Sequence, residues 1–194
     1  MSTDVGHMNM ILPKELLADP DKFRQMLTRP LPVPYSSAAE RGTEFHAALE
    51  KAFALESELD LDDWDSDQRA LAENFENSRF ASRQPVFVEQ SLEFELGGTV
   101  VVCKLDAVFQ NDSEFEIVDW KSGSSPASQE DVAKRAVQLA LYRIGFARWQ
   151  QLGIEKVKAS FFFASDGVEI SPEVPSETEL AARLAELRTA LRPL

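Results

Sequence analysis

Three segments of alternating apolar and polar residues follow one another between residues 86 and 121, and they constrain the fold more than any other feature of the sequence. A side-chain period of two is typical of β-strands, and short turns rich in glycine or asparagine join neighbouring antiparallel strands. Such turn residues separate the three segments, which span 86–95, 99–109 and 114–121. We therefore predict a three-stranded antiparallel meander, whose first strand carries on one side Val86, Val88, Leu92 and Phe94.

Residues with helical spacing flank this meander on both sides. One expected helix begins at Ser37 and carries His46, and the others cover 14–29, 67–80, 129–152 and 176–191. Two further strands are expected at 156–164 and 167–170. Because the long helix can return the chain to the sheet as a crossover, we predict an α/β fold, a central mixed β-sheet flanked by helices.

The length of 194 residues suits one domain with a substantial core and is short for two domains of ordinary size. We therefore expect a single domain over residues 14–194. Residues 1–13 are expected to form a disordered lead-in, and Gly6-His7-Met8 within it is typical of a cloning remnant.

The net charge of −13 would repel nucleic acid if it were evenly spread. It is concentrated, because seven carboxylates and no basic residue lie between Leu55 and Gln68, whereas eight acids and eight bases balance between Lys104 and Lys158. Starting at Asp63, this acidic run lacks the glycine and the final glutamate of a calcium loop, so we interpret it as a solvated surface segment. Charge alone does not exclude a polyanionic substrate.

Several kinds of protein are excluded by what the sequence lacks. Cys103 is the single cysteine, which excludes a disulfide framework, a cysteine-ligated zinc site and a four-cysteine iron–sulfur cluster within this chain. No apolar run reaches the length of a membrane span and no secretory signal is recognisable, so a cytoplasmic protein is expected. The phosphate-binding motif of a helicase motor is absent from the sequence.

The second and third strands of the meander carry the chemistry. Asp119 and Lys121 are two residues apart, so their side chains project to the same side of the predicted strand. Asp106, on the neighbouring strand, is expected to face away from a continuous apolar stripe formed by Cys103, Leu105, Ala107 and Phe109. Two carboxylates and a lysine that converge in this way could bind Mg²⁺ or Mn²⁺ and orient the water that attacks a phosphodiester.

These residues resemble a known family. The segment 116–123, Glu-Ile-Val-Asp-Trp-Lys-Ser-Gly, together with Asp106, resembles motifs II and III of the PD-(D/E)xK nucleases, in particular the RecB-like group. Residues 42–50 are similar to the helix of that group whose histidine binds metal, and residues 138–142 resemble its Q-x-x-x-Y motif. The order of these motifs is similar to that in the C-terminal nuclease domain of bacterial helicase-nucleases of the RecB, AddA and AdnAB type.

The resemblance implies a restriction-endonuclease-like core and assigns roles to individual residues. The catalytic residues would be Asp106, Asp119 and Lys121, with the lysine positioning the attacking water. The ligands of Mg²⁺ or Mn²⁺ would be His46, Asp106, Asp119 and the backbone carbonyl of Trp120. The cysteines that hold an iron–sulfur cluster in some relatives are absent, so no such cluster is expected.

For each of the remaining candidate residues, an alternative interpretation stays open. Glu50 and Glu89 could support the metal ligands from a second layer, or could be ordinary surface acids. Gln138 and Tyr142 share a helix face and, by the resemblance, would contact DNA, although the tyrosine could also lie at the edge of the core. Lys134 and Arg135 could meet the phosphate backbone or be solvated.

The function that follows is metal-dependent hydrolysis of DNA by the nuclease module of a helicase-nuclease, acting in DNA end processing and recombinational repair. An exonuclease is favoured over an endonuclease. The expected partners are single-stranded DNA or duplex ends and a helicase motor in the same or another chain, with no membrane. Two alternatives remain open: a catalytically silent module that binds DNA ends or a subunit, and an acidic protein that mimics DNA.

Overall fold

The computed structural model describes residues 37–190. The helix expected at 14–29 and the lead-in at 1–13 lie outside the described residues. The first two helices are α3 (Ser37–Leu55) and α4 (Ser66–Glu76), and three strands follow them: β1 (Phe87–Leu96), β2 (Thr99–Asn111) and β3 (Glu114–Lys121). The chain continues through α5 (Gln129–Gln150), a short 3₁₀ turn (Ile154–Lys156), β4 (Val157–Phe163), β5 (Val168–Ile170) and α6 (Glu177–Ala190).

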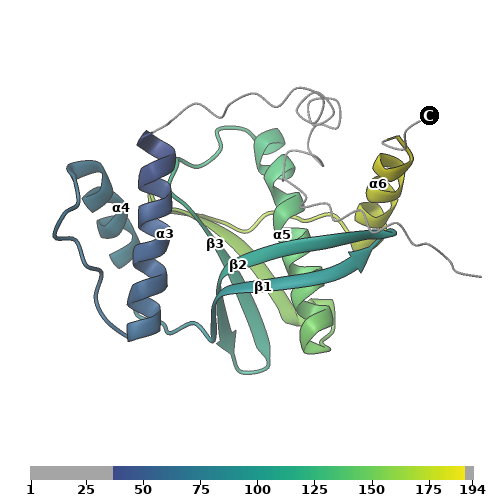
Figure 1. The fold of residues 1–194 in the computed structure, drawn as a ribbon, viewed down its shortest axis with the longest axis horizontal. Helices are drawn as coiled ribbons and strands as arrows, with labels where there is room; N and C mark the ends of the chain where they lie inside the picture. Colours follow the sequence, from purple (N-terminus) through teal and green to yellow (C-terminus); the bar gives the residue numbers. More distant parts are fainter. Residues whose placement is uncertain (1–36, 191–194) are drawn as a thin grey trace, which may run out of the picture.

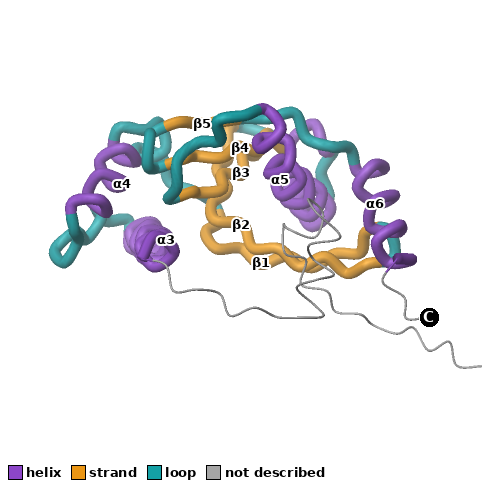
Figure 2. Tube along the Cα trace, turned by 90° about the horizontal axis from the view of Figure 1, so that it is seen from above, coloured by secondary structure: helices purple, strands orange, loops and turns teal. Residues whose placement is uncertain are grey.

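The five strands form one mixed sheet in the order β1-β2-β3-β4-β5. The first three strands pair antiparallel, which confirms the predicted meander. After α5 crosses over, β4 pairs parallel to β3, and β5 then pairs antiparallel to β4. The α3–α4 pair lies on one side of this sheet and the α5–α6 pair on the other (Figures 1 and 2). The predicted α/β architecture is therefore confirmed for the described part of the chain.

Both faces of the sheet are buried, and each face has its own apolar layer. The layer beneath α3 and α4 is rich in phenylalanine and includes the indole of Trp120. The layer beneath α5 contains aliphatic and aromatic side chains from α5 itself and from all five strands. The run 161–163 serves both layers, because Phe162 packs beneath α3 and α4 whereas Phe161 and Phe163 pack beneath α5. This run is therefore a core strand, as its sequence indicates.

In the acidic segment between α3 and α4, Asp65 has a defined structural role. Asp65 is the N-cap of α4: its side chain accepts a hydrogen bond from the Gln68 backbone at 2.9 Å, and Gln68 Oε1 accepts one from the Asp65 backbone at 2.8 Å. This reciprocal pair satisfies two backbone donors that a helix start leaves open. The helix ends at Glu76, four residues before the predicted end.

The apolar stripe predicted along residues 103–109 changes face halfway along β2. Cys103 and Leu105 pack into the layer beneath α5, whereas Ala107 and Phe109 pack into the layer beneath α3 and α4. The prediction of one continuous stripe is therefore wrong. Asp106 lies at the point where the strand changes face.

A break in the pairing of β1 with β2 accounts for this change. Glu89 and Asp106 lie opposite each other but are not paired, although the pairs on either side of them keep register: Val88 with Ala107 and Gln90 with Leu105. Glu89 has a φ of 53°, in the left-handed region that an extended strand does not use. Because the register is the same on both sides of the break, one residue of each strand is left unpaired and neither strand is longer than its partner, so the break is not a β-bulge. The strict alternation predicted for 86–95 is wrong for the same reason, because Val88 and Leu92 pack on opposite faces.

Candidate functional site

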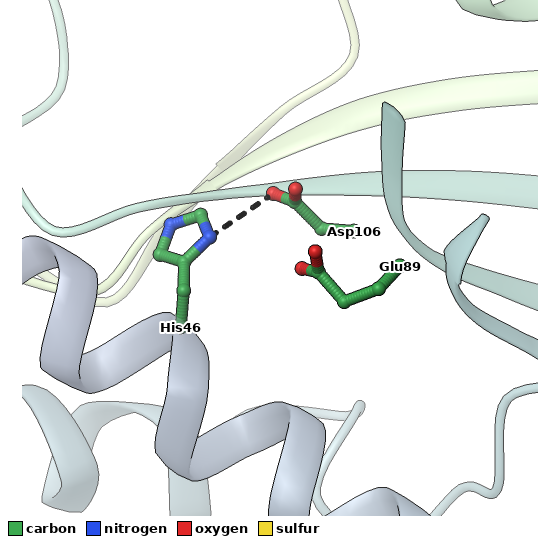
Figure 3. Close-up of side chains that lie close together, drawn as sticks. All are labelled: His46, Glu89 and Asp106. Carbon is green, nitrogen blue, oxygen red and sulfur yellow. Dashed lines mark ion pairs between the residues drawn. The ribbon is translucent and has the colours of Figure 1, made fainter. Parts of the chain in front are cut away.

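One imidazole and two carboxylates meet where α3 crosses the break in the sheet. Among the described residues, the ligand atoms of His46, Glu89 and Asp106 lie within 4.8 Å of one another. His46 Nδ1 is 3.7 Å from Asp106 Oδ2. The three side chains come from α3, β1 and β2 and point toward a common space (Figure 3). Imidazole and carboxylate donors are suitable ligands for a divalent transition-metal ion or Mg²⁺.

The packing of α3 places His46 at this point. Phe45, Leu49 and Phe53 recur every four residues and are buried against the sheet, so one face of the helix is fixed. His46 is the neighbour of the first of these anchors and lies at the edge of the buried face, with 31% of its side chain exposed. The break in the sheet supplies the other two groups, because it directs Glu89 and Asp106 toward α3 instead of into an apolar layer.

Asp106 is held in a setting that opposes its negative charge. Only 13% of its side chain is exposed, and burial, followed by the nearby charge of Asp119, raises the pKa of its carboxyl well above the usual value. The backbone N–H of Trp120 donates a hydrogen bond to Asp106 Oδ2 at 2.8 Å and acts in the opposite direction. A cation bound beside this carboxylate would offset the cost of burying its charge.

Burial acts on His46 in the complementary sense. It lowers the pKa of the imidazole, and the charge of Asp119 and a hydrogen bond with the Trp120 backbone oppose this effect only in part. The ring is therefore held in its neutral form, which is the form that binds metal. The donor set and the neutral imidazole thus fit a divalent cation.

Asp119 lies beside the group of three but is not a member of it. The residue is 1% exposed, and its Oδ1 accepts a hydrogen bond from Gln138 Nε2 at 2.7 Å. Its Oδ2 forms an ion pair with the ammonium group of Lys121 but accepts no hydrogen bond from the described residues. A buried carboxylate oxygen with this open capacity fits a position next to a cation. Where the sequence predicts that His46, Asp106 and Asp119 meet, the structure gathers the first two with Glu89.

Asp119 and Lys121 project to the same face of β3, as their spacing predicts. The ammonium group of Lys121 lies 3.3 Å from Gln138 Oε1 and 5.6 Å from the centroid of the Phe161 ring. Lys121 is thus held between a carboxylate, an amide and an aromatic ring. These contacts fix a positive charge next to the acidic group of three.

Trp120 contributes its backbone to the site and its side chain to the core. The peptide N–H bonds to Asp106, and the backbone also bonds to His46. The indole is 2% exposed and stacks on Phe53 of α3 at a centroid distance of 6.4 Å. This stacking ties α3 to β3 directly behind the candidate metal ligands.

Gln138 and Tyr142 lie on the inner side of α5. Gln138 Nε2 donates to Tyr142 Oη at 2.6 Å as well as to Asp119, so the amide links the tyrosine to the Asp119–Lys121 pair. Tyr142 is 7% exposed and packs in the layer beneath α5, and burial raises the pKa of its hydroxyl. The sequence places both residues on one helix face but does not reveal that this face is turned toward β3.

The remaining predicted residues are exposed on α3 and α5. Glu50 is exposed on α3, one turn after His46. Lys134 forms an ion pair with Glu130 at 2.8 Å, and Arg135 is exposed on the same helix. These three side chains are not gathered with the candidate ligands.

Sequence reasoning missed Lys104. Its ammonium group forms an ion pair with Glu89, and the charges of Glu50 and Asp106 also raise the pKa of this lysine. A signal was available, because Lys104 lies two residues before Asp106 on a predicted strand. Residues two apart share a face only in a regular strand, and this strand is irregular at Asp106. The spacing alone therefore did not place Lys104 at the site.

Comparisons with known proteins agree with the fold. A family model described as the PD-(D/E)XK nuclease superfamily matches residues 22–194. The crystal structure named "Putative exonuclease" from Eubacterium rectale is 13% identical, with a TM-score of 0.56 over 86% of this chain and 70% of that one. The crystal structure of SSO0001 is 17% identical, with a TM-score of 0.54 over 98% of this chain and 80% of that one.

No curated protein sequence matches the chain. Within residues 37–190, no helix is both long and apolar enough to cross a membrane. The five-stranded mixed sheet between two pairs of helices is the restriction-endonuclease-like α/β fold.

Proposed function

Because the chain belongs to the PD-(D/E)XK nuclease superfamily, we propose that it is a deoxyribonuclease that depends on Mg²⁺ or Mn²⁺. The observation that carries the proposal is the meeting of His46, Glu89 and Asp106 within 4.8 Å, beside the Asp119–Lys121 pair. A metal-ligand group and an adjacent fixed ammonium are the two components that hydrolysis of a phosphodiester requires.

Each residue of the site has a definite part in this proposal. His46, Asp106 and Asp119 hold the cation, with Glu89 and the carbonyl of Trp120 beside them. When bound, the cation supplies Lewis acidity toward the phosphoryl oxygen and lowers the pKa of a water molecule. Its positive charge also offsets the two effects that raise the pKa of Asp106, which are burial and repulsion by the charge of Asp119.

The protein's own groups then orient the reaction. Lys121 positions the attacking water and offsets the negative charge that develops on the phosphoryl group. Gln138 holds Lys121 and Asp119 in place through hydrogen bonds to both. In-line attack leaves a 5′-phosphate and a 3′-hydroxyl. Gln138 and Tyr142 are thereby positioning residues, a role that the hydrogen bonds of Gln138 and the burial of Tyr142 support better than direct contact with DNA.

The mode of action and the setting are finer parts of the proposal. We assign an exonuclease that processes DNA ends as the nuclease module of a RecB-like helicase-nuclease, with residues 14–194 forming that single module. The motifs at 42–50, 116–123 and 138–142 support this subtype. The net charge of −13 supports a motor that delivers the strand, since an isolated acidic module attracts DNA poorly.

Digestion of labelled single-stranded DNA with Mn²⁺ or Mg²⁺ tests the proposed activity. We expect Asp119→Ala and Lys121→Ala to lower the rate about 100-fold or more, the loss typical of a residue that takes part in proton transfer or charge stabilisation. Asp62→Ala and Lys51→Ala, two exposed residues, are the matched controls and should digest DNA like the wild type. Equal digestion by all five proteins, or DNA binding without cation-dependent cleavage, would refute the assignment.

A further inference from the structure

A cavity of about 250 Å³ lies between the beginning of α3, α4 and the loop that follows β3. It adjoins the candidate site along two elements at once. Ser122 and Gly123 in its wall follow Lys121 directly, and Arg41 precedes His46 on α3 by five residues. None of the residues assigned to the cation or to catalysis lines this cavity.

Close packing fixes the relation between α3 and the loop. A Cβ atom at Gly42 would lie only 2.6 Å from Ser122 Oγ, so the serine hydroxyl rests directly against the helix at this glycine. On the other side of the loop, a Cβ atom at Gly123 would meet no atom within 4 Å. Arg41 and the loop are therefore held together while the loop borders open space.

The polar groups of the cavity suit an anion. Arg41 supplies a guanidinium group, and Ser122 and Ser165 supply hydroxyl groups. Arg41 Nη2 is 3.7 Å from a carboxylate oxygen of Asp67, whose side chain is 71% exposed. An exposed ion pair at this distance contributes little free energy, so the guanidinium group can exchange Asp67 for a better partner. Guanidinium groups bind phosphate through paired hydrogen bonds.

We propose that this cavity binds a phosphate group of the nucleic-acid strand whose neighbouring phosphodiester is cut, with Arg41 as the cationic partner. The inference rests on the proposed function, because the site next to the cavity is what brings a strand there. Asp67 competes with the phosphate for Arg41. Loss of Arg41 and loss of the Asp67 charge should therefore affect binding in opposite directions.

Binding without cleavage provides the test. We would measure the affinity of the full chain for a fluorescent single strand in EDTA over a range of salt concentrations. Arg41→Gln should weaken binding about tenfold and reduce the salt slope by about 0.7, the value of one phosphate contact on a single strand. Asp67→Asn should tighten binding, and Arg41→Lys should recover part of the loss. Arg183→Gln, an exposed arginine on α6, is the matched control and should change little.

Strands with a 5′-phosphate and with a 5′-hydroxyl separate the two sources of the phosphate. If the cavity takes a terminal phosphate, Arg41→Gln weakens only the phosphorylated strand. If it takes an internal phosphate, both strands lose affinity equally. The proposal is overturned if Arg41→Gln matches the wild type in affinity and salt slope with both strands, or if Asp67→Asn weakens binding. Should Arg41→Gln not fold, Asp67→Asn must tighten binding more than Asp62→Asn does, because Asp62 is an exposed acid of the same segment that does not line the cavity.

This outcome is distinguishable from failure of the proposed function. A wild-type protein that cuts DNA and depends on Asp119, combined with an Arg41→Gln variant that binds normally, removes only the phosphate site. A wild-type protein that shows no cation-dependent cleavage removes the proposed function.

Discussion

At the scale of one residue, the buried charge of Asp106 lowers the stability of the metal-free protein. Burial and the charge of Asp119 both raise the pKa of its carboxyl. The folded protein therefore binds this proton more tightly than the unfolded chain does. It follows that the Asp106 contribution to stability, without metal, falls as the pH rises above the ordinary carboxyl value near 3.8. The cost is complete once the pH exceeds the raised pKa of Asp106.

Replacing Asp106 by asparagine should consequently stabilise the metal-free protein. The amide oxygen can still accept the hydrogen bond from Trp120, while the buried charge is removed. We expect a higher melting temperature at neutral pH, by about 2–4 °C for each kcal/mol gained. Mn²⁺ should raise the melting temperature of the wild type, because a ligand that binds only the folded state stabilises it. This gain should be largely lost in Asp106→Asn.

Thermal unfolding with and without Mn²⁺ measures both effects. Asp62→Asn removes an exposed carboxylate and should show neither. An Asp106→Asn protein that melts lower than the wild type, or that gains as much from Mn²⁺, would contradict this account of the residue.

At the scale of elements, the sequence predicts what depends on local period and fails where two strands act together. The period of two locates β1, β2 and β3, and it correctly places Asp119 and Lys121 on one face. It fails at Glu89 and Asp106, where the two strands interrupt their pairing and Glu89 has a φ of 53°. No pattern within a single strand encodes that pairing.

The site was predictable to a similar extent and for similar reasons. The family resemblance identified His46 on α3, and the structure brings it to Asp106. The hydrogen bonds of Gln138 to Asp119 and Lys121 depend on how α5 packs across β3. Such contacts join residues 17 and 19 positions apart in the chain, so spacing along one element does not reveal them.

The hairpin between β1 and β2 provides a prediction about elements. Gly97 has a φ of 58° and lies so near the backbone of Ala181 on α6 that no Cβ atom fits between them. Gly97→Ala should therefore lower the free energy of unfolding by about 2–4 kcal/mol, since it combines backbone strain with overpacking. Gly123→Ala is the control, because its Cβ atom would meet nothing within 4 Å. Chemical denaturation of both variants would measure the difference, and equal stabilities would show that α6 does not rest on this turn.

At the scale of the whole molecule, the acidic charge opposes the approach of a nucleic-acid strand. The acidic segment that joins α3 to α4 lies on the same side of the sheet as His46 (Figure 2). Fields of exposed charges extend about 10 Å at 0.1 M salt, so this segment repels an approaching strand without touching it. We therefore expect the segment to slow the rate at which a nucleic-acid strand reaches the site.

Neutralising part of the segment should speed association. Asp62→Asn combined with Asp63→Asn removes two exposed charges and should raise the association rate with single-stranded DNA several-fold at low salt. The gain should vanish near 1 M salt, where the screening length is about 3 Å. Glu173→Gln with Glu186→Gln, two exposed acids outside this segment, should have a smaller effect. Stopped-flow binding measures the rates, and equal gains for both pairs would mean that only total charge matters.

The unpaired positions in β1 and β2 separate the scaffold from its chemistry. Glu89 and Asp106 are the unpaired residues of the two strands, and the apolar side chains before and after them pack into the two layers of the core. Neither apolar layer therefore includes the side chain of Glu89 or Asp106. The reactive side chains at these two positions could therefore change in evolution without a change in either apolar layer.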